Sequence, residues 1–395
     1  MAADIFVFLL VLIIGFYFPK ILKFQKRDLK NLKWLWLYHL FFGLYYHYGV
    51  MQEGGSDALK FWEGAKTATA NQALLTLLEL KGTRAMYAIN YFPSSILDLS
   101  FFSGSMIYTF IGFMGICFFY RIIIELIPYN SKVLSINIFP FLFYLPNLHF
   151  WSVAVGKDTL LFFAVGLFSY SFLNLRKRTL LIIFSLLLAY LVRPHIMLFL
   201  ALSFSMAYLF NNKVKPYMRF FLFSILIGIG ILILPTVAEY AQMEELSFES
   251  YEEFAERGVE NLSRSHTGSS VDVSSYSFPL KVFTFLYRPT FIDIVSLPSL
   301  LAALENFIVL LFSLALFKKR IVKTFKASPF IIKGLVFFLI IGTITFSMSL
   351  GNLGIMLRMK NMFLPGLLIF IIWSFSYQQQ LKLEKQGRAT IPKTK

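Results

Sequence analysis

Apolar segments separated by shorter polar ones make up most of this chain. Eleven of them are candidates for membrane-crossing helices, because charged residues rarely interrupt them. They lie at about residues 5–18, 34–50, 104–120, 134–150, 159–175, 179–192, 196–210, 220–237, 294–317, 330–350 and 362–377. The pattern predicts an all-α fold, a polytopic membrane helix bundle of about 11 transmembrane helices.

Two polar segments are too long to be simple connections. Residues 51–103 contain two weakly amphipathic pieces, 73–80 and 84–97, which we expect to lie along the membrane surface. Residues 239–290 form the one long outer loop, acidic at first and rich in serine later. A loop of this length inside a membrane domain is typical of a lid or docking segment.

The composition agrees with a membrane location. Hydrophobic residues make up 57% of the 395 residues and the mean hydropathy is +0.68, which exceeds the values of ordinary globular domains. The single cysteine, Cys117, excludes a disulfide framework and a Cys-based metal site. We expect one transmembrane helical domain over residues 1–377, followed by a basic cytoplasmic tail over residues 378–395.

The distribution of basic residues predicts the orientation. In the first 33 residues the positive charges follow the apolar segment, so this helix is expected to remain with its N-terminus outside. Strict alternation then makes five segments and the C-terminal tail cytoplasmic, and these six together hold 24 of the 37 Lys and Arg. The net charge of +16 therefore follows from the positive-inside pattern, and nucleic acid is not expected as a partner.

Several basic residues depart from this pattern because they fall on the predicted outer face. Arg193, Arg288 and Arg358 each stand at the end of an apolar segment. A guanidinium stays charged and binds phosphate oxygens through two N–H groups, so these positions favour a lipid-linked anionic substrate. The alternative is that each arginine extends to lipid headgroups from a helix end.

Acids and aromatic residues at the same face supply the other candidates. Lys157 and Asp158 close a polar turn that begins near Trp151. They are expected either to form part of the site or to pair with each other, with Asp158 capping the next helix. Asp57, in the first outer loop, is a candidate general base for a sugar hydroxyl or an ordinary solvated acid. His195 follows Arg193, and no acid cluster accompanies the histidines, so no metal site is expected.

Four stretches taken together resemble a known group of proteins. They are Pro146…Phe150-Trp151-Ser152…Gly156-Lys157-Asp158, Val192-Arg193-Pro194, Tyr287-Arg288-Pro289 with Leu301-Ala-Ala-Leu-Glu305, and Gly351-Asn352…Arg358…Pro365. Residues 50–370, roughly, resemble the Wzy-like and EpsG-like repeat-unit polymerases of bacterial polysaccharide gene clusters. Those are related in architecture to O-antigen ligases and GT-C-type membrane glycosyltransferases.

The resemblance implies polymerisation of undecaprenyl-diphosphate-linked oligosaccharide repeat units at the periplasmic face of the bacterial inner membrane, without cofactor or metal. By this analogy Arg193, Arg288 and Arg358 hold the diphosphate, and Asp57 or Asp158 activates the acceptor hydroxyl. Lys157, His195 and Trp151 complete the expected substrate-binding set. We expect a chain-length regulator or a flippase as a protein partner. The chiefly acidic outer loop departs from the family pattern, in which this loop is often rich in Arg or His.

Two other functions stay open. A monosaccharide transferase that uses a polyprenyl-phosphate sugar would favour an acidic pair in the first outer loop, where Glu53, Glu63 and Asp98 accompany Asp57. A lipid-glycan flippase or transporter would want charges along a path through the bundle. Glu305, inside the ninth apolar segment, favours that alternative.

Overall fold

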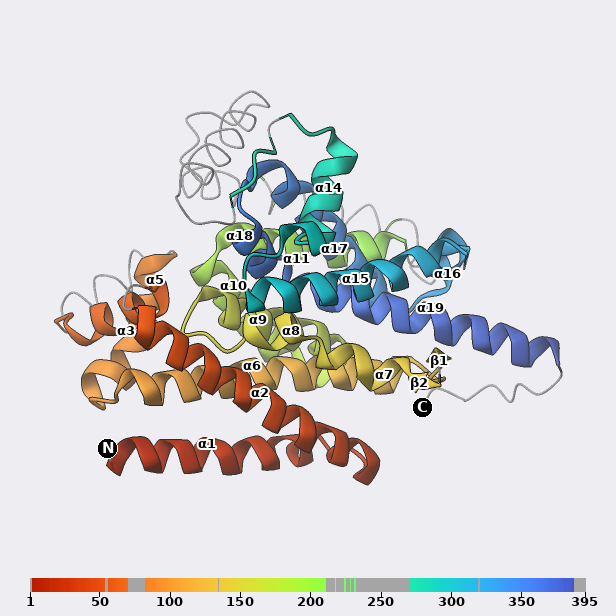
Figure 1. Cartoon of the computed structure of the whole chain (residues 1–395). Helices are drawn as coiled ribbons and strands as arrows, with labels where there is room; N and C mark the ends of the chain where they lie inside the picture. Colours follow the sequence, from red (N-terminus) through yellow and green to blue (C-terminus); the bar gives the residue numbers. More distant parts are fainter. Residues whose placement is uncertain are drawn as a thin grey trace. The chain divides into compact units, whose positions relative to one another are not determined.

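The computed structural model describes residues 2–53, 56–69, 82–133, 135–210, 270–273, 275–318 and 320–386, with four single residues between 217 and 231. Nearly all of this part is helical (Figure 1). The longer helices are α1 (Ala2–Ile21), α2 (Lys26–Glu53), α6 (Phe101–Leu126), α9 (Lys157–Ser171), α10 (Leu175–Val192), α11 (Pro194–Leu209), α15 (Leu297–Phe317), α17 (Phe330–Ser349) and α19 (Leu364–Lys385).

Shorter elements connect these helices. They are α3 (Asp57–Lys66), α5 (Thr83–Tyr91), η1 (Phe92–Ile96), β1 (Lys132–Val133), β2 (Ile136–Asn137), α7 (Ile138–Phe141), η2 (Leu142–Tyr144), α8 (Pro146–Phe150), η3 (Phe172–Asn174), α14 (Phe278–Tyr287), η4 (Phe291–Asp293), α16 (Ile321–Ala327) and α18 (Leu353–Lys360). The antiparallel pair β1–β2 is the one sheet among the described residues.

By length and composition, several described helices can cross a membrane, so the chain is a multi-pass membrane protein. Four helices qualify alone: α1, α6, α15 and α17. The pair α18 and α19, bent by 59°, makes a fifth if it is one span. The predicted count of eleven is therefore not supported. Helices α2, α9, α10 and α11 do cover predicted segments, but they are too short or not apolar enough to qualify.

One predicted span is wrong in its structure. Residues 134–150 do not form one helix, because the described part divides into β2, α7, a 3-10 turn and α8. Pro140 lies within α7 and Pro146 begins α8. Proline lacks the backbone N–H and clashes with the preceding turn, which breaks a longer helix. The predicted span 220–237 and the surface piece 73–80 lie outside the described residues, apart from single positions.

The described chain divides into two compact units. The first comprises residues 1–121 and 148–198, and the second comprises residues 122–147 and 199–395. The predicted outer loop 239–290 belongs to the second unit. Its described part contains α14 and a backbone hydrogen bond of 2.9 Å from Val271 N to Gly351 O.

In the first unit, α9 packs along α10, and close backbone approach positions the turn before α9. A Cβ atom on Gly112 of α6 would lie 1.8 Å from the carbonyl oxygen of Ser152. Glycine at this position therefore lets α6 touch the backbone of the turn, as small residues do between membrane helices. The Trp36 ring lies 4.8 Å from the Phe113 ring in the same core.

Different segments contact one another at the two ends of the first unit. At one end Ser103 donates a 2.8 Å hydrogen bond to Asp4, and Lys157 donates to Thr83 at 3.2 Å. At the other end, Arg121 contacts the carbonyl of Lys23 and Tyr120 donates to Asp28. Asp4 and Asp28 are thus held by contacts at opposite ends of this unit.

The second unit shows a similar separation. Helix α19 packs on α17, and the Phe363 ring just before α19 lies 4.6 Å from the Phe338 ring of α17. At one end, Ser131 bonds Gln379 at 2.9 Å and Trp373 bonds the carbonyl of Thr324 at 3.2 Å. The polar network described below lies at the other end, where α14 stops and α15 begins.

Candidate functional site

In the first unit a buried ion pair joins two of the predicted site residues. Arg193 Nη1 lies 3.0 Å from Asp158 Oδ1, and the side chains are only 13% and 6% exposed. Asp158 stands in the first turn of α9, not at its N-cap, which is Gly156. Arg193 is held in an extended conformation between α10 and α11, as expected of a residue that precedes proline. The guanidinium is therefore fixed at the ends of three helices.

Lys157, next to Asp158, contacts helices α3 and α5. Its ammonium donates to Thr83 Oγ1 at 3.2 Å and lies 5.7 Å from the centre of the Phe61 ring. Phe61 belongs to α3, which begins at the exposed residue Asp57, one turn earlier. The structure thus brings α3, α5 and the start of α9 together around one cation.

The remaining predicted residues of the first unit lie close by in sequence. His195 is half-buried in the first turn of α11, two residues after Arg193. Trp151 packs its ring edge-on against Phe150 at 4.8 Å, and its indole N–H makes no hydrogen bond to the described residues.

A histidine pair in this unit does not amount to a metal site. His39 Nδ1 lies 2.9 Å from His149 Nδ1, and His39 Nε2 lies 3.0 Å from the carbonyl of Thr109. A carbonyl only accepts, so His39 Nε2 carries the proton, and in a neutral His39 the Nδ1 atom accepts from His149. No group of three His, Cys, Asp or Glu among the described residues could hold a metal ion.

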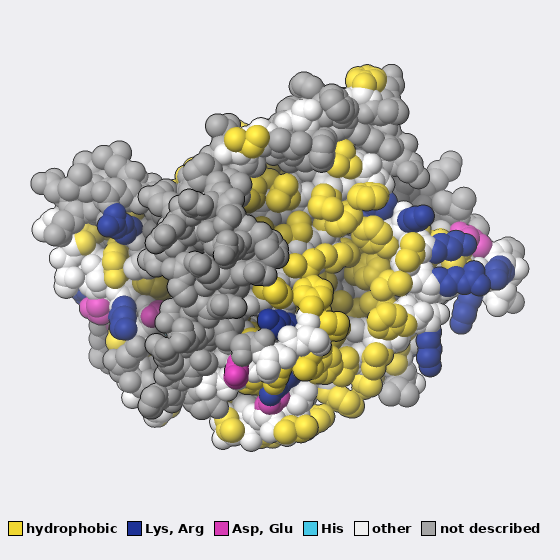
Figure 2. Space-filling model, turned by 90° about the horizontal axis from the view of Figure 1, so that it is seen from above, with side chains coloured by type: hydrophobic (Ala, Val, Ile, Leu, Met, Phe, Trp, Pro, Cys, Tyr) yellow, Lys and Arg dark blue, Asp and Glu magenta, His cyan; other side chains and the backbone are white. Residues whose placement is uncertain are grey.

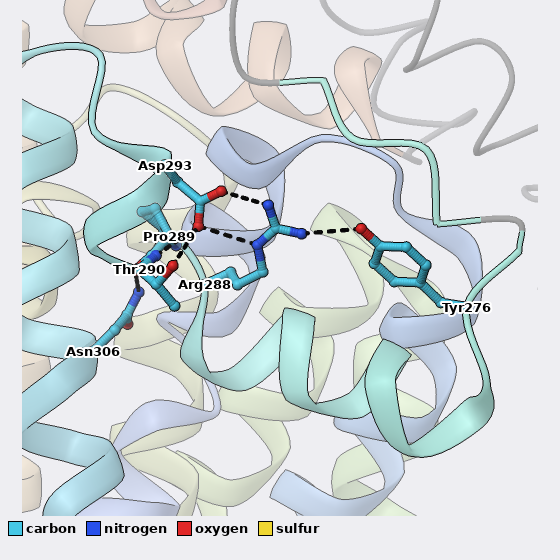
Figure 3. A network of polar contacts seen from close by, with 6 residues as sticks. All are labelled: Tyr276, Arg288, Pro289, Thr290, Asp293 and Asn306. Carbon is cyan, nitrogen blue, oxygen red and sulfur yellow. Dashed lines mark hydrogen bonds and ion pairs between the residues drawn. The ribbon is translucent and has the colours of Figure 1, made fainter.

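In the second unit Arg288 is held by a carboxylate and a phenol (Figure 3). Its Nε donates to Asp293 Oδ2 at 3.1 Å, its Nη2 bonds the other carboxylate oxygen, and its Nη1 donates to Tyr276 at 3.3 Å. Thr290 donates to the same carboxylate through its backbone N–H and its hydroxyl, at 2.7 and 2.9 Å. These contacts use three of the five N–H groups of the guanidinium.

Each group of this ion pair stabilises the ionised form of the other. The hydrogen bonds with Asp293 raise the pKa of Arg288 above its ordinary value. Partial burial acts to raise the pKa of Asp293, but the hydrogen bonds from Arg288 and Thr290 outweigh it and lower the pKa. Both groups are therefore ionised at neutral pH.

A second layer of polar contacts supports the Arg288 loop. Asn306 on α15 donates to the carbonyl of Pro289 at 3.0 Å, and its amide oxygen accepts from Lys360 at 2.6 Å. Lys360, at the end of α18, also donates to the carbonyl of Leu286 at 2.9 Å. It is 3% exposed. Helices α14, α15 and α18 are thus joined behind the loop.

The neighbouring residue Glu305 is a buried acid on α15. It is 2% exposed, and its Oε2 accepts from the backbone N–H of Asn147 at 2.6 Å. Glu305 Oε1 and the side-chain nitrogen of Asn147 make no hydrogen bond to any residue that the structure describes. Arg358, the third predicted arginine, is half-buried on α18, two residues before Lys360.

The predicted site residues therefore fall into two groups. Asp57, Trp151, Lys157, Asp158, Arg193 and His195 belong to the first unit, and Arg288 and Arg358 belong to the second. Sequence reasoning missed Asp293, Tyr276 and Asn306, which hold Arg288 in place. The capping pattern Thr290 to Asp293 was the available signal for one of them.

Comparison with known proteins identifies no relative of this chain. The chain matches none of the protein-family models, curated proteins or solved structures with which it was compared.

Proposed function

We propose that this protein is a bacterial inner-membrane glycosyltransferase that polymerises undecaprenyl-diphosphate-linked oligosaccharide repeat units at the periplasmic face. The observation that carries the proposal is the pair of arginines fixed by carboxylates at the ends of apolar helices. Arg193 is held by Asp158 and Arg288 by Asp293. A guanidinium oriented in this way at the edge of a membrane domain suits a lipid diphosphate.

In the proposed reaction a sugar hydroxyl of one lipid-linked unit attacks the anomeric carbon of the other glycan. The new C–O bond replaces the bond to the diphosphate, which leaves as undecaprenyl diphosphate. The hydroxyl proton passes to a carboxylate, and the arginines stabilise the charge on the leaving group.

The two candidate acids fit different parts of this scheme. Asp57 is exposed at the start of α3 and is the better candidate for the general base. Asp158 is 5% exposed and bound to Arg193, so it suits the positioning of that guanidinium. Lys157, His195, Trp151 and Arg358 are the remaining residues proposed to bind substrate.

The orientation forms part of the proposal. The N-terminus is outside and the C-terminus cytoplasmic, so that the end of each unit with the arginines faces the periplasm. The opposite ends contain the segments rich in Lys and Arg, which favours the cytoplasm for them. A chain-length regulator or a flippase is a proposed partner.

The test is gel analysis of lipid-linked glycans from cells lacking this gene, complemented by wild type or by Arg288→Gln. Accumulation of single repeat units, relieved by wild type and not by Arg288→Gln, is the expected result. Lys281→Gln is the matched control, because it removes a cation of α14 that forms none of the described site contacts. Truncated repeat units would instead indicate a monosaccharide transferase.

Buried charge inside α15 favours a second candidate, a lipid-glycan flippase or transporter. Glu305 and Lys360 lie within the apolar helices of the second unit, and intramembrane charges often mark transport pathways. Purified protein that lengthens lipid-linked oligosaccharides in detergent, with nothing else added, would exclude a role limited to transport.

A further inference from the structure

An apolar groove runs along the second unit at the end of α15 opposite to Arg288. Its volume is about 480 Å³, and it lies between α15, α19 and the segment from β1 to α7. Its walls include Ile138, Phe141, Ile308 and Phe312. Lys318 is the one charged residue in the lining.

The length of the groove matches one leaflet of a bilayer. On α15 the lining residues recur on one face, from Ile308 through Ala315 to Lys318. At a rise of about 1.5 Å per residue this stretch spans about 15 Å. The hydrocarbon core of a bilayer is about 30 Å thick, so the groove reaches from its edge to about its middle.

The chemistry of the lining selects the kind of occupant. Nine of the ten lining residues are apolar, and the tenth is Lys318 at one end of the groove. A hydrocarbon chain with an anionic head matches this lining, because the chain meets apolar side chains and the head meets the ammonium. Leu311 and Ile136, on opposite walls, are 50% and 53% exposed, so the groove opens to the surroundings.

Positive charge surrounds the end of the groove at Lys318. Lys318 is exposed just after the last turn of α15, and the exposed Lys132 precedes the lining residue Val133. Further cations, Lys326, Lys382 and Lys385, come from α16 and α19 at this end of the unit. Figure 2 shows basic side chains gathered along one side of an apolar face. Basic residues at a membrane surface attract anionic headgroups.

We propose that this groove is a binding site for an anionic phospholipid. One acyl chain lies along α15 between Phe141 and Phe312, and the phosphate meets the ammonium of Lys318. The proposal concerns a site away from the arginines and does not depend on the glycan chemistry.

The test uses the full-length protein, purified in detergent, stripped of lipid and titrated with phosphatidylglycerol or phosphatidylcholine of the same chains. Native mass spectrometry counts the lipids bound. We expect one phosphatidylglycerol to bind more tightly than phosphatidylcholine. Ala315→Trp fills the groove and should remove this lipid, whereas Leu314→Trp, on the adjacent exposed face, should retain it.

A charge variant tests the headgroup contact without changing the core. Lys318→Gln should weaken phosphatidylglycerol binding about fivefold, the effect of one cation at an anionic surface, and leave phosphatidylcholine unchanged. Lys323→Gln, an exposed lysine outside the groove, is its control. Equal binding of the two lipids to wild type, or equal loss in both lysine variants, would overturn the proposal. So would a dimer that Ala315→Trp dissociates, because the occupant would then be a second copy.

Discussion

The carboxylate of Glu305 accepts a 2.6 Å hydrogen bond from the backbone N–H of Asn147, although 158 positions separate the two residues. Residues 142–147, which include Asn147, are largely buried, so this hydrogen bond anchors their segment to α15 within the second unit. The charge of Lys360 also acts on this carboxylate. An acid placed in this way inside a membrane protein is compensated by a donor and a cation.

Removal of Glu305 should destabilise the protein through the lost contact with Asn147. Glu305→Ala leaves this buried N–H without its acceptor and is expected to cost about 1–3 kcal/mol. Thermal unfolding in detergent measures this. Glu305→Gln together with Lys360→Met should cost much less than the sum of the single changes. Strictly additive effects would mean that the two charges do not interact.

Asn306→Ala tests the support behind the Arg288 loop. The change removes the donor to Pro289 O and the acceptor of Lys360, so an expected loss of about 2–3 kcal/mol exceeds that of a neutral hydrogen bond. Ser374→Ala on α19 is the control, since the Ser374 hydroxyl bonds only its own turn at Phe370 among the described contacts. Unfolding midpoints that fall equally in both variants would contradict a special role for Asn306.

The ion pair of Arg288 and Asp293 predicts a pH dependence. Because the pKa of Asp293 is lowered in the folded state, the pair stabilises the protein fully above the unfolded pKa of about 3.9. That stabilisation is lost as the pH falls through the folded-state pKa. Wild type should therefore unfold at a higher temperature than Asp293→Asn by a constant margin between pH 5 and pH 8.

Below about pH 4 the margin between wild type and Asp293→Asn should shrink. Unfolding midpoints collected across this range in one detergent give the measurement. A margin that persists unchanged at low pH would mean that the Asp293 charge is not the source of the stabilisation.

A double-mutant cycle on Asp158→Asn and Arg193→Gln should detect strong coupling. Both side chains are largely buried, so each single variant leaves an uncompensated charge, and the coupling is expected at about 1–3 kcal/mol. The exposed pair of Lys66 and Asp98, 2.8 Å apart, is the comparison and should show coupling close to zero. Similar coupling in both pairs would contradict the importance of burial.

Gly112→Ala should disturb the turn before α9. The added Cβ would meet the Ser152 carbonyl oxygen at 1.8 Å, so α6 or the turn has to move, at an expected cost of about 1–3 kcal/mol. Gly49→Ala in α2 has open space around its Cβ and should be neutral or stabilise by about 0.5–1 kcal/mol. If Gly112→Ala and Gly49→Ala change the free energy of unfolding equally, the close approach of α6 to the turn does not contribute to stability.

Much of the fold was predictable because its signals are local in the sequence. Helices cover nine of the eleven predicted apolar segments in the described part, including those that become α6, α15 and α17. The prediction of one helix over residues 134–150 was wrong. Hydropathy values do not show that Pro140 and Pro146 interrupt the helical backbone. Hydropathy reports burial, whereas helix continuity also requires an unbroken series of backbone donors.

The candidate site was predictable only in part. The sequence identified Arg193 and Asp158 as chemically important but proposed Lys157 as the alternative partner for the acid. It identified Arg288 without Asp293 or Tyr276, because pairing depends on which side chains the turn after α14 brings together.

The sequence by itself determined a helical membrane protein, and it predicts basic segments on one side and isolated arginines on the other. Those properties follow from hydropathy and charge, which each short segment carries independently of the rest. Only the tertiary structure decided the partners: Asp158 for Arg193, Asn147 for Glu305, and the groove beside Lys318. Such contacts join residues far apart in the chain, so they depend on how the helices pack and not on any local pattern.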